Sequence, residues 1–214
     1  MTKKEWQRSV DCRDLLHDAE SLFCEHPDTR LPRLLACAAC RLLWKDLTDP
    51  RSRRAVEIAE RYSDGDATRK ELSAANRDAT AAFREARGTP SSQPTGAAVK
   101  ASRPNNLQGA MIETLVHISG GRDNPWEEAL HSMIHDVFDN RFFRIVRLEP
   151  GLRTSTVTAL ALQMYESRDF SAMPILADAL QDAGCDNDEV LNHCRGAGPH
   201  VRGCWVVDLV LRKE

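Results

Sequence analysis

Residues 183–214 read AGCDNDEVLNHCRGAGPHVRGCWVVDLVLRKE and hold the densest group of potential metal ligands in the sequence. Cysteine and histidine recur there with the spacing C-x7-H-C-x5-H-x3-C. The residues concerned are Cys185, His193, Cys194, His200 and Cys204. Thiolate sulfur and imidazole nitrogen are the ligands that a tetrahedral zinc ion prefers. The run therefore contains a candidate structural zinc site.

The same five residues also fit ordinary packing. The paired C-x2–4-C knuckles of many structural zinc sites do not occur in this run, and a free cysteine is commonly a small core residue. Cys185 follows a predicted helix terminator, Gly184, and Cys204 precedes an apolar segment. The sequence thus leaves zinc ligation and simple burial open, favours burial, and indicates no other cofactor.

Two short helices with a GAGP turn between them are predicted within this run. Asp186 and Glu189 form a D-x-x-E start for the first, which ends near Arg195. Pro199 suits the first position of the second helix. The final apolar segment WVVDLVL, residues 205–211, is rich in β-branched residues and also suits a strand. Because no hairpin partner is evident, we predict a helix.

Helical spacing continues through the rest of the chain. Asp49 with Pro50, and Thr68 with Glu71, supply two clear helix starts, a proline-containing cap and a capping box. An extended or irregular segment is expected over residues 141–150. The predicted helices cover residues 3–25, 31–44, 51–62, 68–87, 107–118, 126–138, 154–165 and 171–183.

Residues 88–106, GTPSSQPTGAAVKASRPNN, interrupt this pattern. They are rich in Pro, Gly, Ser and Thr, and Val99 is their only sizeable apolar residue, so little burial is available to offset chain entropy. We therefore predict an all-α protein of two small helical bundles, residues 1–87 and 107–214, joined by a flexible, disordered linker at 88–106.

The composition argues against nucleic-acid-binding, membrane and secreted proteins. The 29 basic and 32 acidic residues give a formal charge of -3, so no global field attracts nucleic acid or an anionic membrane. No apolar run approaches the ~20 residues that span a bilayer, and the first residues lack the apolar region of a secretory signal. Seven cysteines, an odd number, are most simply reduced thiols. These features predict a cytoplasmic protein without a membrane partner.

No catalytic motif accompanies these features. Cys37 and Cys40 form a C-x2-C, but they lie in the middle of a predicted helix, where two buried small residues are favoured. His131 and His135 lie four residues apart, which suits a metal ligand pair but more often a solvated stripe. Nucleophile-elbow, P-loop and GxGxxG patterns do not occur. The sequence favours a protein that is not an enzyme.

Arginines recur over residues 141–153, at Arg141, Arg144, Arg147 and Arg153. Nucleic-acid binding through this segment would need these side chains on one face. Acidic residues nearby make a solvated or salt-bridged surface the simpler interpretation, so the sequence does not favour nucleic acid as a partner.

Three stretches resemble a large paralogous family of uncharacterised bacterial proteins. They are LPRLLACAACRLLW (31–44), DPRSRRAVEIAERYSDGDAT (49–68) and PILADALQDAGCDNDEVLNHCRGAGPHVRGCWVVDLVL (174–211), and HVRGCWVVDL (200–209) is the most specific part. Similar tails end multidomain proteins that carry leucine-rich-repeat companion or Smi1/Knr4-type modules, and residues 176–191 resemble the helix-turn-helix of the repeat-companion domain. The resemblance implies a helical module used in protein–protein contexts, without a known activity or assigned site residues.

Three functions follow in order of preference. The first is a non-enzymatic interaction or regulatory module that binds an unknown protein partner in a helical groove through Leu176, Trp205 and Leu209. The second is a domain supported by structural zinc at the cysteine and histidine run, and the third is nucleic-acid binding through residues 141–153.

Overall fold

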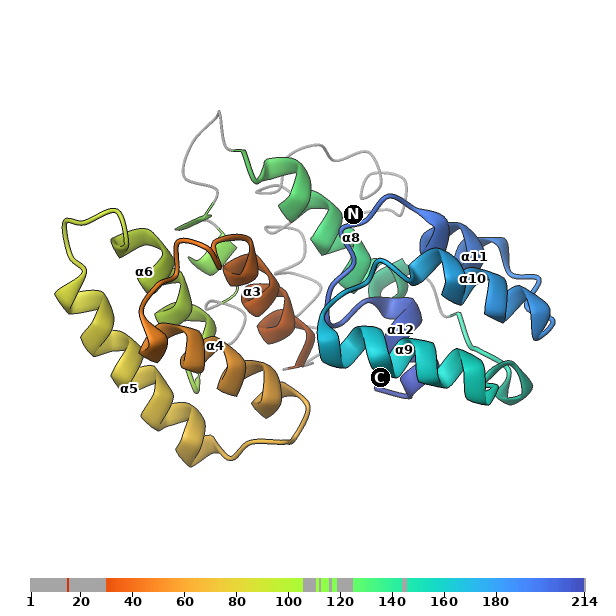
Figure 1. Ribbon diagram of the computed structural model, residues 1–214, viewed down its shortest axis with the longest axis horizontal. Coiled ribbons are helices and arrows are strands. Elements are labelled where there is room, and N and C mark those ends of the chain that lie inside the picture. The colour runs from red at the N-terminus through yellow and green to blue at the C-terminus, as the bar shows by residue number, and fades with distance from the viewer. Residues whose placement is uncertain are drawn as a thin grey trace. The chain divides into compact units, whose positions relative to one another are not determined.

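The computed structural model describes Leu15 and residues 30–105, 111, 113–115, 117–118, 125–143 and 146–213, with the backbone alone for 140–143. Every regular element in these residues is a helix (Figure 1), which confirms the all-α prediction. The chain divides into two compact units, Met1–His131 and Ser132–Glu214. None of the helices described is both long and apolar enough to cross a bilayer.

Four helices form the described part of the first unit: α3 (Arg30–Leu42), α4 (Pro50–Ser63), α5 (Arg69–Glu85) and α6 (Ser92–Ala101). α4 packs against the other three, and α6 also packs against α3 and α5. The predicted starts of α4 and α5 are confirmed. The Asp49 side chain accepts from the backbone N–H groups of Arg51 and Ser52, and Thr68 and Glu71 form the reciprocal capping box.

Helix α6 corrects the prediction of a disordered linker at 88–106. Small residues on α6 allow its backbone to approach its neighbours closely, so the helix is buried without large apolar side chains. A Cβ added to Gly96 would lie 2.9 Å from Nε2 of His117 and 3.0 Å from Cε2 of Phe83. Asn76 on α5 also donates to the Val99 carbonyl at 2.7 Å. A count of bulky apolar residues does not predict this helix, because the buried residues of α6 are mostly small.

Gly96→Val is expected to lower the free energy of unfolding of the first unit by about 1–3 kcal/mol, because the added methyl groups enter occupied space. Chemical denaturation of the full chain measures the effect. Gly151→Ala is the control, since its added Cβ meets nothing within 4 Å. Equal stability of G96V and the wild type would show that α6 tolerates bulk as a loose linker does.

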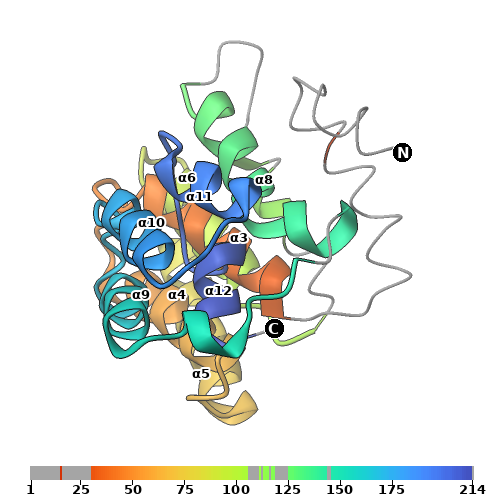
Figure 2. The same ribbon diagram turned by 90° about the vertical axis from the view of Figure 1, so that its right-hand side faces the viewer.

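The second unit contains most of α8 (Glu127–Phe143), in which the boundary between units falls, and five later elements. These are the short 3-10 helix η1 (Pro150–Leu152), α9 (Ser155–Ser167), α10 (Met173–Asp182), α11 (Asp188–Arg195) and α12 (Trp205–Leu211). α9 packs against α10 and α12, and α11 packs against α10 and α12 (Figures 1 and 2).

Several details of the second unit differ from prediction. The final apolar segment is helical as expected, but α12 begins at Trp205 rather than near Pro199. Asn187, not Asp186, caps α11, and its side chain accepts from the N–H groups of Glu189 and Val190. α8 continues to Phe143, where an extended segment was predicted.

Two predicted helices lie only partly within the described residues. The helix at 3–25 lies outside them except for Leu15, which is helical and buried. Within 107–118, the residues that are described are helical.

Candidate metal centre

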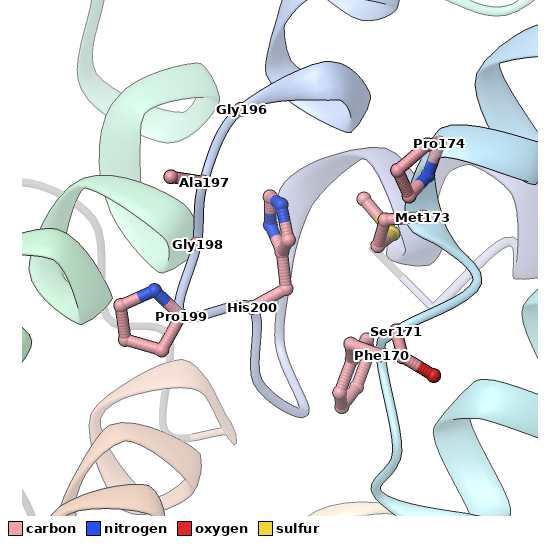
Figure 3. Close-up of a pocket in the computed structure, with 9 residues that line it drawn as sticks. All are labelled: Phe170, Ser171, Met173, Pro174, Gly196, Ala197, Gly198, Pro199 and His200. Carbon is pink, nitrogen blue, oxygen red and sulfur yellow. The ribbon is translucent and has the colours of Figure 1, made fainter.

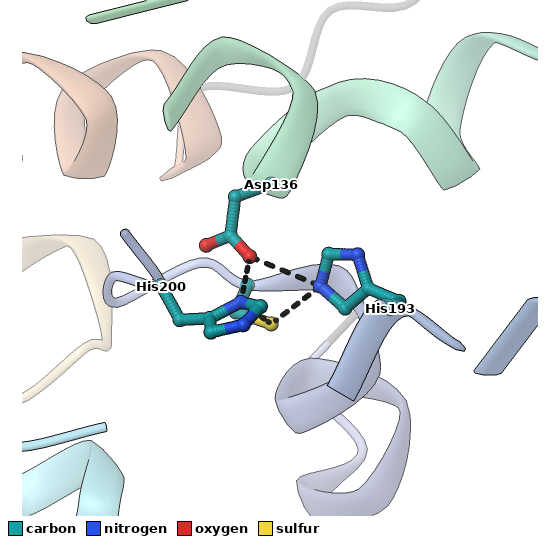
Figure 4. A group of neighbouring side chains, drawn as sticks. Asp136, His193 and His200 are labelled. Atoms are coloured by element: carbon teal, nitrogen blue, oxygen red, sulfur yellow. Dashed lines mark hydrogen bonds and ion pairs between the residues drawn. The ribbon is translucent and has the colours of Figure 1, made fainter. Parts of the chain in front are cut away.

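Asp136 on α8 is the centre of a buried polar cluster in the second unit (Figure 4). Its Oδ1 lies 2.7 Å from Nδ1 of His200 and 3.0 Å from Nε2 of His193. Its Oδ2 accepts the backbone N–H of Val201 at 2.9 Å. Only 3% of the Asp136 side chain is exposed. One carboxylate thus receives three donors from residues that lie far along the chain.

Cys204 completes the cluster. Its Sγ lies 3.3 Å from Nε2 of His193 and 4.0 Å from Nδ1 of His200. The four possible ligand atoms, one each from Asp136, His193, His200 and Cys204, all lie within 4.8 Å of one another. Elsewhere in the part of the chain that the structure describes, no three or more such side chains converge in this way.

These separations are close to those that a metal requires. A tetrahedral ion with bonds of about 2.0–2.3 Å holds its ligand atoms about 3.3–3.6 Å apart. The oxygen–nitrogen pairs, at 2.7 and 3.0 Å, are somewhat shorter, and the sulfur–nitrogen pairs, at 3.3 and 4.0 Å, bracket that range. Seating an ion would replace the two oxygen–nitrogen hydrogen bonds and draw together the more widely separated of the four atoms, which lie within 4.8 Å of one another.

Local sequence places each of the four side chains. His193 lies in the last turn of α11, and Cys204 occupies the position just before α12. The loop between them turns at Gly198, where φ is +72° and an added Cβ would lie 3.0 Å from the backbone nitrogen of His200. The same loop is anchored by Arg202, whose Nε donates to the Tyr165 carbonyl at 2.8 Å. Glycine is needed at 198 both for the left-handed backbone and for space.

Electrostatics bind the carboxylate to its histidines. Burial on its own raises the pKa of Asp136, but hydrogen bonds from His193 and His200 outweigh it and lower the pKa to about 2. Burial lowers the pKa of His200, but the hydrogen bond and negative charge of Asp136 raise it by more. The pKa of His200 therefore lies above that of a free histidine. Burial, and then the Asp136 charge, raise the pKa of the Cys204 thiol well above its usual range, although the Val207 N–H acts in the opposite sense.

The cluster differs from a nucleophilic triad. In a triad the two nitrogens of one histidine contact different groups, the nucleophile and the carboxylate. Here a single nitrogen of His193, Nε2, faces both Asp136 and Cys204. Cys204 is also fully buried, and its raised pKa keeps it a thiol. The four groups, within 4.8 Å of one another, could instead hold a metal ion.

The structure brings together three of the five residues proposed from the sequence, His193, His200 and Cys204. Cys185 and Cys194 lie outside the group, as buried free thiols in the apolar core. Burial is the first cause that raises the pKa of Cys194 to about 12. Their positions agree with packing rather than ligation.

Sequence reasoning missed Asp136. It considered His131 and His135 on the same helix, but His135 instead pairs with Asp139, with Nδ1 and Oδ1 2.8 Å apart. Asp136 is a carboxylate between buried apolar residues, Ile134 and Val137, on α8. A buried acid in such a setting needs partners, and this was the signal available in the sequence.

The residues proposed to bind a protein partner lie in the core of the second unit. Leu176 and Leu209 are almost completely buried, and Trp205 is 4% exposed. The Trp205 Nε1–H donates to Nδ1 of His193 at 2.9 Å. All three contribute to packing, and Trp205 also contacts the cluster.

The remaining candidates have structural surroundings. Cys37 and Cys40 are buried within α3, and burial raises the pKa of Cys40 to about 12. Arg153 donates to the carbonyls of Leu148 and Leu209, so its guanidinium is engaged within the unit, whereas Arg147 is exposed. The side chains of Arg141 and Arg144 lie outside the described residues.

A pocket of about 340 Å³ lies beside the cluster, between the loop at 196–200 and the segment that opens α10 (Figure 3). The His200 ring stands between these two walls. Its Nε2 is buried and makes no hydrogen bond to the described residues. The His200 ring therefore lines the pocket, but its Nε2 is not accessible to a ligand there.

Comparison with protein-family models, curated proteins and solved structures finds no match to this chain. The family resemblance described from the sequence stays a prediction.

Proposed function

We propose that the second unit, Ser132–Glu214, is a zinc-stabilised helical domain. Asp136, His193, His200 and Cys204 are the proposed ligands. The observation that carries the proposal is the convergence of four ligand atoms of suitable chemistry within 4.8 Å. Burying carboxylate and imidazole groups costs hydration, and their mutual hydrogen bonds offset this cost in the absence of an ion.

A structural role fits this ligand set better than a catalytic one. Catalytic zinc keeps an open position beside three protein ligands, whereas structural zinc is closed by four. The side chains of Asp136, His200 and Cys204 are at least nine-tenths buried, which leaves little access for a substrate. The domain also fits the non-enzymatic role expected from the sequence.

The mixture of one sulfur, two nitrogens and one oxygen favours zinc among abundant divalent ions. Magnesium and calcium prefer oxygen ligands throughout, whereas imidazole and thiolate suit zinc and neighbouring transition metals. Zinc binding would replace the Cys204 thiol proton and release it to solvent.

A matched set of cysteine variants tests the proposal. The full chain is purified, loaded with Zn²⁺ and dialysed, and its metal content is measured by mass spectrometry. One equivalent is expected for the wild type, C185A and C194A, and C204A is expected to retain less than one equivalent after dialysis, because it alone loses a ligand.

Two results would count against the assignment. Absence of stoichiometric zinc from the wild type would remove the function itself. Equal loss of zinc in C194A and C204A would instead show that a different set of residues, including Cys194, holds the ion.

A further inference from the structure

Trp205 makes an unusual contact with the proposed ligand His193. Its indole Nε1–H donates to Nδ1 at 2.9 Å, and the two ring centroids lie 4.8 Å apart. Indole nitrogen is a donor only, so Nδ1 must accept. A neutral imidazole carries one proton, and the proton of His193 is therefore on Nε2, the nitrogen that faces Asp136 and Cys204.

Metal ligation requires the opposite arrangement. An imidazole that ligates through Nε2 carries its proton on Nδ1, and in most metal sites that second N–H donates to a carboxylate, a carbonyl or water. At His193 the same position is taken by another donor, the indole N–H. Two donors cannot share this hydrogen bond, so the Trp205 contact and ligation through Nε2 exclude each other.

We propose that Trp205 is a positioning residue that holds His193 in the tautomer unable to bind metal, and so lowers the affinity of the cluster for zinc. The inference rests on the proposed function. Zinc binding then has a structural consequence: the indole of Trp205, the first residue of α12, loses its acceptor on α11. Occupancy of the site thereby changes the contact between these two helices.

The proton balance is simple. On zinc binding, His193 gives up the Nε2 proton and takes one on Nδ1, and His200 exchanges its Nδ1 proton for one on Nε2. For rings that are neutral before binding, the charge of each ring is unchanged, so the Cys204 thiol supplies the one proton that is released, while Asp136 contributes an oxygen lone pair.

Nitrogen-15 NMR of the native full chain tests this without a mutation. Long-range ¹⁵N–¹H spectra distinguish the two tautomers, and the Trp205 indole N–H gives its own resonance. With chelator present, His193 is expected as the Nε2–H tautomer. After one equivalent of Zn²⁺, we expect the Nδ1–H tautomer and an upfield shift of the Trp205 indole proton as its hydrogen bond is lost.

The outcomes separate the two proposals. If zinc binds at one equivalent and is weakened by C204A, but His193 stays Nε2–H and the indole resonance does not move, the role of Trp205 is overturned while the zinc site stands. An Nδ1–H tautomer in chelator also overturns it. If no zinc binds, the proposed function fails, and this inference fails with it.

Trp205→Phe adds an affinity measurement. Removing one opposing hydrogen bond is expected to tighten zinc binding about three- to tenfold in competition with a chromophoric chelator. Trp44→Phe is the control, because Trp44 belongs to the first unit and stacks with Arg41. A folded W205F chain that binds zinc more weakly than the wild type would show that Trp205 supports ligation instead. If W205F does not fold, the NMR result decides.

Discussion

Replacing Asp136 with alanine is expected to lower the free energy of unfolding of the second unit by about 3–5 kcal/mol, even with chelator present. The substitution leaves three buried donors, on His193, His200 and Val201, without their acceptor. An unsatisfied buried donor costs more than the hydrogen bond contributes. Amide hydrogen exchange of α9 and α12 measures the change within the second unit alone.

Asp178→Ala is the matched control for this variant. Asp178 lies in the same unit and pairs with Arg195, but 71% of its side chain is exposed. Exposed substitutions of this kind usually change stability by within about 0.5 kcal/mol. If the amides of α9 and α12 exchange equally slowly in D136A and D178A, the hydrogen bonds of Asp136 do not stabilise this unit.

Saturation with zinc is expected to raise the melting temperature of the second unit by about 15–30 °C. A ligand present at about 1,000 times its dissociation constant stabilises the folded state by about 4 kcal/mol, and a domain of this size gains about 4–8 °C for each kcal/mol. Differential scanning calorimetry of the full chain, with zinc or with chelator, measures the shift. The transition of the first unit should stay in place, since its described residues contain no comparable ligand cluster.

The C204A variant controls for non-specific zinc effects. It keeps the rest of the unit but lacks the sulfur ligand, so its transition is expected to move little. A zinc-induced shift as large in C204A as in the wild type would contradict binding at this cluster. So would equal shifts in both units.

Much of the helical framework was predictable because capping residues and glycines in the sequence determine where the helices begin and end. Asp49 and Thr68 cap the helices that their side chains predict, and Gly184 takes a left-handed backbone, with φ of +97°, just past α10. Helix α6 was missed because its stability comes from close backbone packing around Gly96. Packing of that kind depends on neighbouring helices and leaves no hydrophobic pattern of its own.

The candidate site was predictable only in part for a geometric reason. His193 and Cys194 are neighbours on α11, and adjacent residues of a helix point about 100° apart. Only one of them can face the cluster, and the sequence does not say which. His200 and Cys204 were expected to lie in the last predicted helix, which was to begin at Pro199, but they meet through a loop that brings His200 back toward Asp136. The apolar neighbours of Asp136 indicate that this acid needs partners, but the partners could not be identified because they are distant in sequence.

That separation gives the cluster a further consequence. Asp136 and His200 are 64 positions apart, and one ion held by both would be a removable cross-link across most of the second unit. A cross-link that closes a long loop stabilises a fold chiefly by restricting the unfolded chain, as a disulfide does. A metal achieves this restriction without oxidation, so the seven cysteines of the chain can all remain reduced while the ion links α8 to the start of α12.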